Sequence, residues 1–430
     1  MKLIRIQEKV VTKNHIHFHI IPTKKFKTVN IVMKCKAPLA RNTITKRALL
    51  PFILQKGTEH YPSEKKLMLR LDELYGASLY IEGAKKGDNH IITFRLEVAN
   101  ERYLPNKTPV LDEALSLLKE IIFSPRLEND RFIEQVVERE KLTLMNKINA
   151  VFDDKLTYAN KRLIEEMCQN ERYQIHKDGY KEDLPGINGE NLYEYYEQML
   201  QEDRMDLYVL GDVEVKNIEN LLVQTFRRDV HRTESTLISE DEPTITEIKE
   251  IKEYQPVQQA KLHIGYRTNS TYKDDDYFAL QVFNGIFGGF PSSKLFVNVR
   301  EKHSLAYYAA SRIESHKGLL IVYSGIAPTD EEKAREIIDL QFEAMKKGDF
   351  TEEQVEETKG LIISELKETL DHSYGLPELL YQQVIGERQL SPQQYIEQLN
   401  VVTKQDIVEI ANKITPDTVY ILTNDGSDLK

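Results

Sequence analysis

The same order of strand-like and helix-like segments occurs twice along the chain, and this repetition limits the fold more than any single motif. In the first half, periodic apolar residues predict strands near 15–19, 29–33, 78–82, 90–98 and 206–210, and helices near 44–55, 64–75, 114–122, 128–150 and 189–200. The second half restarts this order, with strands near 261–266, 305–311, 318–326 and 418–422 and helices near 276–287, 330–347 and 351–370. The repeat is one of element order, not of residue identity.

A chain of 430 residues is too long for one ordinary core, so two domains of about 200 residues are expected. Residues 232–256 are rich in Thr, Ser, Glu and Pro and have few apolar residues, which is typical of a linker. We therefore expect an N-terminal domain over 1–231 and a C-terminal domain over 257–430. The predicted fold class is α+β, with two tandem homologous domains that each pack helices on a mostly antiparallel sheet.

The charge balance excludes some partners. The chain has 58 basic and 69 acidic residues and a net charge of -11, whereas nucleic acids and anionic membranes select for basic patches. The two cysteines, Cys35 and Cys168, fit no disulfide framework, and no apolar run has the length of a signal core or a membrane span. These features predict a cytoplasmic protein without a nucleic-acid or membrane partner.

Three histidines, His15, His17 and His19, alternate along the first strand and could be taken for a metal site. Three side chains on one lone strand usually lack the geometry that closes around a metal ion. A partly exposed strand face is the preferred interpretation.

Several short motifs occur in a fixed order along nearly the whole chain. They are Lys56-Gly-Thr58, Leu74-Tyr-Gly-Ala77, Glu138-Arg-Glu-Lys141, Leu210-Gly-Asp212 and Arg300-Glu-Lys followed by Leu305-Ala-Tyr307. In this order and at these spacings the chain resembles the pitrilysin/insulinase group and the mitochondrial processing peptidases, whose zinc motif is H-x-x-E-H.

The resemblance implies a zinc site in the first domain, but its residues are replaced. Members of the group need two histidines one helical turn apart, a glutamate base between them and a glutamate from a later helix. Counted back from Lys56-Gly-Thr58, the two histidine positions hold Ala48 and Phe52, and the base position holds Pro51. The later helix keeps Glu140, but the ligand position one heptad further on holds Lys147. Apolar side chains and a cation oppose a dication, so we expect this chain to bind no metal and no other cofactor.

The second domain keeps what the resemblance implies for substrate binding. Arg300 and Tyr307 match the arginine and tyrosine that hold a peptide substrate across the cleft, and Gly288 and Gly289 match part of a glycine-rich substrate loop. Without the resemblance, Arg300 would be a residue at a helix end, Tyr307 a strand residue and the glycines part of a turn. Tyr308, on the other face of the strand, is expected in the core.

Three functions remain open at this stage. The first is a non-catalytic subunit of a heterodimeric zinc peptidase, in which a homologous partner chain carries the zinc and this chain contributes Arg300 and Tyr307. The second is a zinc-less structural or peptide-binding module with no part in catalysis. The third, a self-sufficient metallopeptidase, requires a zinc site that the sequence does not contain.

Overall fold

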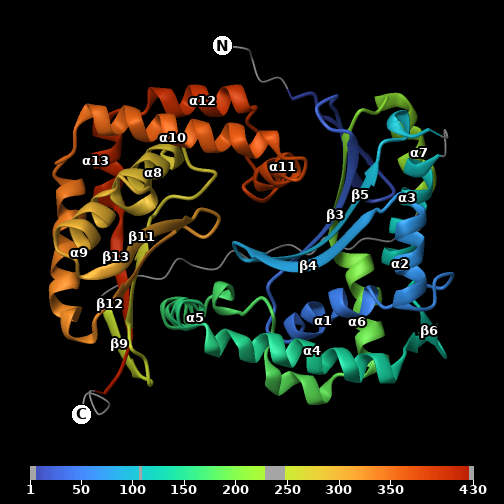
Figure 1. The fold of residues 1–430 in the computed structure, drawn as a ribbon, viewed down its shortest axis with the longest axis horizontal. Helices are drawn as coiled ribbons and strands as arrows, with labels where there is room; N and C mark the ends of the chain where they lie inside the picture. Colours follow the sequence, from blue (N-terminus) through green and yellow to red (C-terminus); the bar gives the residue numbers. More distant parts are fainter. Residues whose placement is uncertain (1–5, 106–108, 228–246, 426–430) are drawn as a thin grey trace.

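The computed structural model describes residues 6–105, 109–227 and 247–425. Two large sheets lie side by side, and helices cover the outer face of each (Figure 1). The helices begin where the sequence provides caps. For example, the Ser63 hydroxyl accepts a hydrogen bond from the Lys66 backbone N–H at 3.3 Å, and Thr351 and Gln354 form a reciprocal capping box.

The first sheet has the strand order β1-β2-β8-β3-β5-β4. Neighbouring strands are antiparallel, except that β2 and β8 run parallel. The strands are β1 (Lys9–Lys13), β2 (Ile16–Pro22), β3 (Thr28–Pro38), β4 (Ser78–Lys86), β5 (Asn89–Ala99) and β8 (Arg204–Gly211). A separate short hairpin consists of β6 (Leu127–Glu128) and β7 (Arg131–Phe132).

The second sheet has the strand order β11-β12-β10-β13-β9. Here β9 and β13 run parallel, and the other neighbours are antiparallel. The strands are β9 (Lys249–Tyr254), β10 (Ala260–Arg267), β11 (Ala306–Glu314), β12 (Leu319–Ile326) and β13 (Thr415–Thr423).

The two sheets share one topology. When β1 is set aside, the strands β2, β3, β4, β5 and β8 of the first sheet correspond in chain order to β9, β10, β11, β12 and β13 of the second. With this replacement, the order β2-β8-β3-β5-β4 becomes β9-β13-β10-β12-β11, which is the order of the second sheet read from its other edge. The parallel pair also falls at the same place in both sheets. The predicted α+β fold with two mostly antiparallel sheets is therefore confirmed.

Most helices pack on the sheet of their own half and build two separate cores. The helices of the first half, including α5, are α1 (Ile44–Leu54), α2 (Glu64–Glu73), α3 (Val110–Phe123), α4 (Glu134–Asp153), α5 (Lys155–Met167), α6 (Gly189–Glu202) and α7 (Val215–Thr225). In the second half they are α8 (Tyr277–Asn284), α9 (Glu331–Lys346), α10 (Glu352–Asp371), α11 (Gly375–Ile385), α12 (Pro392–Val401) and α13 (Lys404–Lys413).

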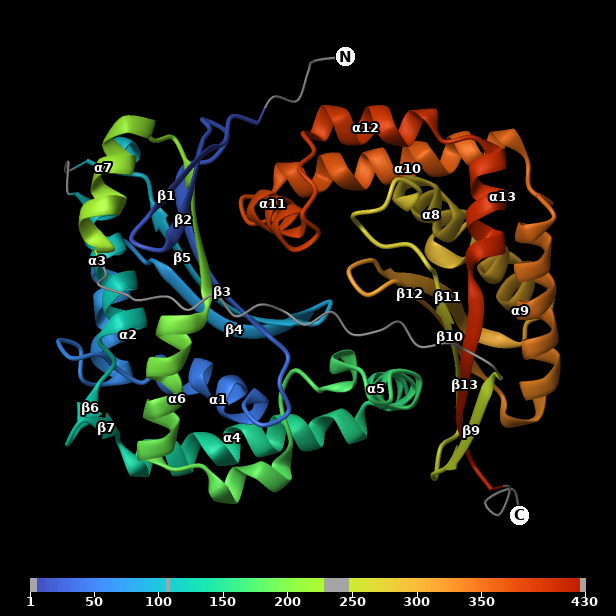
Figure 2. The ribbon, with the colours of Figure 1, turned by 180° about the vertical axis from the view of Figure 1, so that it is seen from behind.

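Two helices cross to the other half. Helix α5 places Leu163 and Met167 in a cluster with Leu319 and Tyr420 of the second sheet. Helix α11, together with the end of α10, forms a cluster with strands of the first sheet. Both views of the ribbon show α5 beside the second sheet and α11 beside the first (Figures 1 and 2). Because α5 follows the long α4 and α11 follows the long α10, the exchange is reciprocal.

The expected linker differs from the structure in part. Residues 232–246 lie outside the described residues, but β9, at 249–254, lies within the expected linker and pairs with β13. Its sequence, KEIKEY, is mostly charged because the strand lies at the sheet edge, where alternate side chains face solvent. The division into domains at 231 and 257 stays a prediction, and the second sheet begins before the expected boundary.

Candidate functional site

The expected zinc position lies where α1 packs against α4. Ala48 is buried and Phe52 is half-buried against the first core. The Lys147 ammonium lies 5.7 Å from the centre of the Phe52 ring and 2.8 Å from the Asp178 Oδ1 atom. A cation with its own carboxylate partner thus lies beside the aromatic ring, so these residues do not fit a zinc ion.

Asp178 was missed by the sequence reasoning because it lies 31 positions after Lys147, in a segment without a recognisable motif. Burial favours its neutral form, but the ammonium groups of Lys177 and Lys147 hold the pKa of the Asp178 carboxyl below its ordinary value. The carboxylate is therefore ionised at neutral pH and serves as the counter-ion of Lys147.

Pro51 lies inside α1 and does not begin it. The helix begins at Ile44 and continues to Leu54. Proline has no N–H to donate to the carbonyl four residues earlier. The Gln55 side chain donates to the Pro51 carbonyl at 2.7 Å, which satisfies an acceptor near the helix end.

Glu140, the acidic residue retained on α4, is buried and accepts a hydrogen bond from Arg139 Nε at 2.8 Å. Lys56 Nζ lies 3.7 Å from the same carboxylate. Within the described residues, no group of three His, Cys, Asp or Glu side chains could hold a metal ion.

Arg300 lies near the end of the π-helical segment η5 (Phe296–Lys302). Its side chain is exposed, and the guanidinium carbon lies 4.6 Å from the centre of the Phe296 ring. Among the described residues, no carboxylate pairs with it. A guanidinium held over an aromatic ring keeps its N–H donors free for a ligand.

Tyr307 lies at the start of β11, the edge strand of the second sheet. The pairing of β11 with β12 shifts between Ala306 and Tyr308, so Tyr307 is the extra residue of a β-bulge. Its side chain is 75% exposed. The bulge explains this exposure, since the extra residue is left out of the regular alternation along the strand.

Tyr308 was expected in the core, but it is only half-buried. The Lys261 ammonium lies 5.4 Å from the centre of its ring. Burial and the nearby Asp154 carboxylate raise the pKa of Tyr308 to about 12.

The expected glycine loop is helical. Helix α8 continues as a π-helical turn, η4 (Gly285–Gly289), with Gly288 buried and Gly289 exposed. A Cβ at Gly288 would lie 2.7 Å from the Ser311 backbone nitrogen and would also overlap the Ser311 hydroxyl. Close packing against β11 thus explains this glycine, and a substrate-binding role for Gly288 and Gly289 stays a prediction.

The three histidines do not form the partly exposed strand face that was expected, because β2 begins after His15 and His19 is buried. His15 lies in the turn between β1 and β2, where it and Asn14 have positive φ angles of 59° and 54°. His17 Nδ1 lies 2.9 Å from the Thr12 hydroxyl. His19 contacts the carboxylates of Glu8 and Asp206 and is buried.

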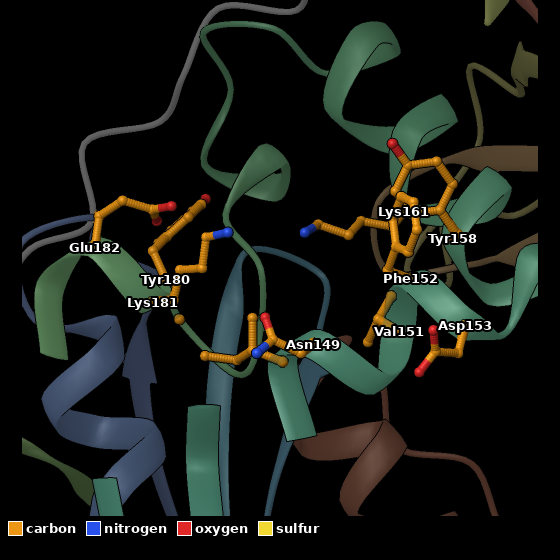
Figure 3. A pocket seen from close by; sticks show the side chains of 11 residues that line it. Asn149, Val151, Phe152, Asp153, Tyr158, Lys161, Tyr180, Lys181 and Glu182 are labelled. Atoms are coloured by element: carbon orange, nitrogen blue, oxygen red, sulfur yellow. The ribbon is translucent and has the colours of Figure 1, made fainter. Parts of the chain in front are cut away.

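A pocket of about 430 Å³ lies next to the expected zinc position, between the end of α4, the start of α5 and the 3-10 helix η3 (Lys181–Gly186) (Figure 3). Ile148 and Gly179, which directly follow Lys147 and Asp178, line it. Lys161 and Lys181 point into it from opposite sides (Figure 3). This pocket could not be predicted from the sequence, because its walls come from separate segments.

No helix within the described ranges is long and apolar enough to cross a lipid bilayer.

Comparisons with known proteins agree with the geometry. Residues 186–361 match the family described as "Peptidase M16 inactive domain". The "Probable inactive metalloprotease YmfF" of Bacillus subtilis is 48% identical over 404 residues, which cover 94% of this chain and 95% of that protein. The crystal structure of a conserved protein from Enterococcus faecalis superposes with a TM-score of 0.90 and 34% identity, covering 98% of this chain and 99% of the other.

A more distant relative is the "Antilisterial bacteriocin subtilosin biosynthesis protein AlbE" of Bacillus subtilis. It is 24% identical over 319 residues, which cover 72% of this chain and 76% of that protein.

Proposed function

Because the chain belongs to the peptidase M16 (pitrilysin) family in its zinc-less form, we propose that it is the non-catalytic subunit of a two-chain zinc peptidase. A homologous partner chain carries the zinc ion and the catalytic base. This chain contributes Arg300 and Tyr307 to the binding of a peptide substrate. The two chains form a heterodimer, and neither cleaves peptides alone.

The observation that carries this proposal is the contrast between the two halves of the expected site. Ala48, Phe52 and Lys147 fill the zinc position with apolar surface and a cation. Arg300 and Tyr307, in contrast, are exposed on the other half, and Tyr307 lies on a bulge at a free sheet edge. An exposed side chain at a bulge of an edge strand is typical of a ligand-binding position.

The two side chains have complementary chemistry toward a peptide. The Arg300 guanidinium can donate two parallel hydrogen bonds to a peptide carbonyl or carboxylate, which orients the backbone. The Tyr307 hydroxyl can donate a hydrogen bond to the oxygen of the scissile carbonyl as negative charge develops there. The partner's zinc ion supplies the activation of water.

The name of one relative favours a peptide substrate. AlbE is named for the biosynthesis of the bacteriocin subtilosin, and bacteriocins are peptides or proteins. We extend this class of substrate to the present chain, without naming a particular peptide.

A cytoplasmic location is part of the same proposal. Cys35 and Cys168 are both buried free thiols, and burial raises the pKa of the Cys168 thiol to about 12. Buried thiols that form no disulfide are typical of proteins from reducing compartments.

Reconstitution tests the proposal. The chain is co-expressed with an M16 chain that has an intact H-x-x-E-H motif, and peptide cleavage is measured for each chain alone and for the pair. Cleavage by the pair only, and its loss in Arg300→Ala with assembly unchanged, are the expected results. Full activity of the Arg300→Ala pair would favour the alternative, a peptidase-like module with no part in catalysis.

A further inference from the structure

The pocket beside the erased zinc position has walls of two kinds. Its apolar wall contains Ile148, Val151 and Phe152, and aromatic rings are added by Tyr158 and Tyr180. Its charged part consists of Lys161 and Lys181, which lie on opposite sides of the cavity and point their ammonium groups toward each other (Figure 3). We call this cavity the two-lysine pocket.

The two lysines are poorly neutralised by the protein itself. Lys181 is exposed and has no carboxylate partner within the described residues. In the part of the chain that the structure describes, Lys161 pairs only with the Glu165 carboxylate, at 3.6 Å, and that carboxylate also accepts a hydrogen bond from Arg162 at 2.8 Å. An ammonium group 3.6 Å from a shared carboxylate gains little from it.

The other carboxylates around the pocket already have partners. Asp178 pairs with Lys147 at 2.8 Å, and Asp183 with Arg41 at 2.6 Å. Asp154 accepts hydrogen bonds from the Leu156 and Thr157 backbone N–H groups at 3.1 and 3.2 Å, which caps α5. These carboxylates are therefore committed to their own cations and to the α5 cap.

Two acidic residues line the pocket itself, Asp153 and Glu182. They lie at its two sides in Figure 3, with Glu182 beside Tyr180, while the two ammonium groups are nearer the middle. The centre of the pocket is thus the place where a negative charge from outside gains most.

We propose that the two-lysine pocket binds a carboxylate of the peptide substrate, carried either by an acidic side chain or by the peptide's C-terminus. This inference rests on the proposed peptide-binding function and adds a charge preference to it. The apolar wall accepts the aliphatic part of such a residue, and the ammonium groups bind its carboxylate. The pocket is well placed for a substrate, because Ile148 and Gly179 in its walls directly follow Lys147 and Asp178 at the erased zinc position.

Peptide binding to the full-length chain tests this inference. The probes are four pools of fluorescein-labelled decapeptides built from uncharged residues. Each pool has a central glutamate or glutamine, and a free or an amidated C-terminus. Fluorescence anisotropy gives the Kd of each pool for the wild-type chain, for Lys161→Gln/Lys181→Gln, and for the matched surface control Lys216→Gln on α7.

The wild-type chain and the Lys216→Gln control are expected to bind at least one carboxylate-bearing pool about five- to tenfold more tightly than the neutral pool, with a preference that shrinks as salt is raised. The double variant is expected to lose that preference and still bind the neutral pool with the wild-type Kd, which shows that it is folded. Preference for the glutamate pool identifies a side-chain carboxylate, and preference for the free C-terminus identifies the terminal one.

Three results would overturn the inference. Equal binding of all four pools by the wild-type chain, or an unchanged preference in the double variant, refutes the two-lysine pocket and leaves the proposed function standing. Failure of every pool to bind the wild-type chain contradicts peptide binding itself and removes both.

Discussion

Arg267 joins the two halves of the molecule, and its removal is expected to destabilise the fold strongly. This buried side chain on β10 donates to Glu171 at 2.6 and 3.0 Å and to Asp417 at 2.7 Å. It also donates to the Met167 carbonyl at the end of α5, at 2.7 Å. Glu171 and Met167 belong to the segment that crosses from the first half to the second sheet, so Arg267 fixes that crossing.

The destabilisation expected for Arg267→Met depends on the contacts that the two carboxylates keep after the substitution. Methionine fills much of the space, but the Glu171 and Asp417 carboxylates lose their shared cation while they stay buried. Glu171 keeps Lys317 at 2.9 Å, and Asp417 keeps the Thr418 hydroxyl at 2.6 Å. Loss of one partner of a buried ion pair costs about 3–5 kcal/mol, and these remaining contacts favour the lower end of that range.

Thermal unfolding followed by circular dichroism measures the effect. For a unit of about 200 residues, a loss of about 3 kcal/mol corresponds to a fall in Tm of roughly 6–12 °C. The matched control is Arg335→Met, which breaks a pair with Glu250, a side chain that is 60% exposed, and is expected to cost at most about 1 kcal/mol. If both variants lower the Tm equally, the assignment of Arg267 as the main polar contact of the crossing is refuted.

Three further expectations concern packing, protonation and metal content. Gly288→Ala should destabilise the chain by about 1–3 kcal/mol in urea unfolding, since the added methyl overlaps Ser311; an unchanged midpoint would contradict the packing described. Burial and the Arg47 guanidinium lower the pKa of His90 to about 3, and its ring contacts the Lys177 carbonyl. As the pH falls, His90 is therefore protonated in the unfolded chain before it is protonated in the folded chain. The free energy of unfolding should fall by about 2 kcal/mol between pH 6.5 and 5, and by less in His90→Gln. An equal pH dependence of the two proteins would refute this. Atomic absorption on the purified chain should find substoichiometric zinc, and one tightly held zinc per chain would overturn the description of the zinc position.

Much of the fold could be predicted from apolar periodicity. The predicted strands at 90–98, 261–266 and 318–326 and helices at 330–347 and 351–370 agree with the structure, because each carries a regular pattern of apolar residues that become buried. Strand β9 was missed because an edge strand with charged alternate residues looks like a linker. The crossing of α5 and α11 could not be predicted, since periodicity shows that a helix has an apolar face but not which sheet covers it.

The candidate site could likewise be predicted from the sequence only in part. Ala48 and Phe52 could be located by their short spacing from Lys56-Gly-Thr58, and Lys147 by its spacing of one heptad from Glu140 on α4. The ion pair of Lys147 with Asp178 joins α4 to a distant loop, which spacing cannot reveal. The bulge that exposes Tyr307 depends in the same way on the register with β12.

The most direct test of the central claim removes a single oxygen atom. The hydroxyl of Tyr307 is proposed to act on a substrate that the partner's zinc site cleaves, so the measurement is single-turnover cleavage by the reconstituted pair that contains Tyr307→Phe. A fall in rate of about 10²–10³-fold is expected, with unchanged assembly and with full activity in the exposed control Tyr103→Phe. A Tyr307→Phe pair that cleaves at the wild-type rate would contradict the claim that this chain completes the partner's site.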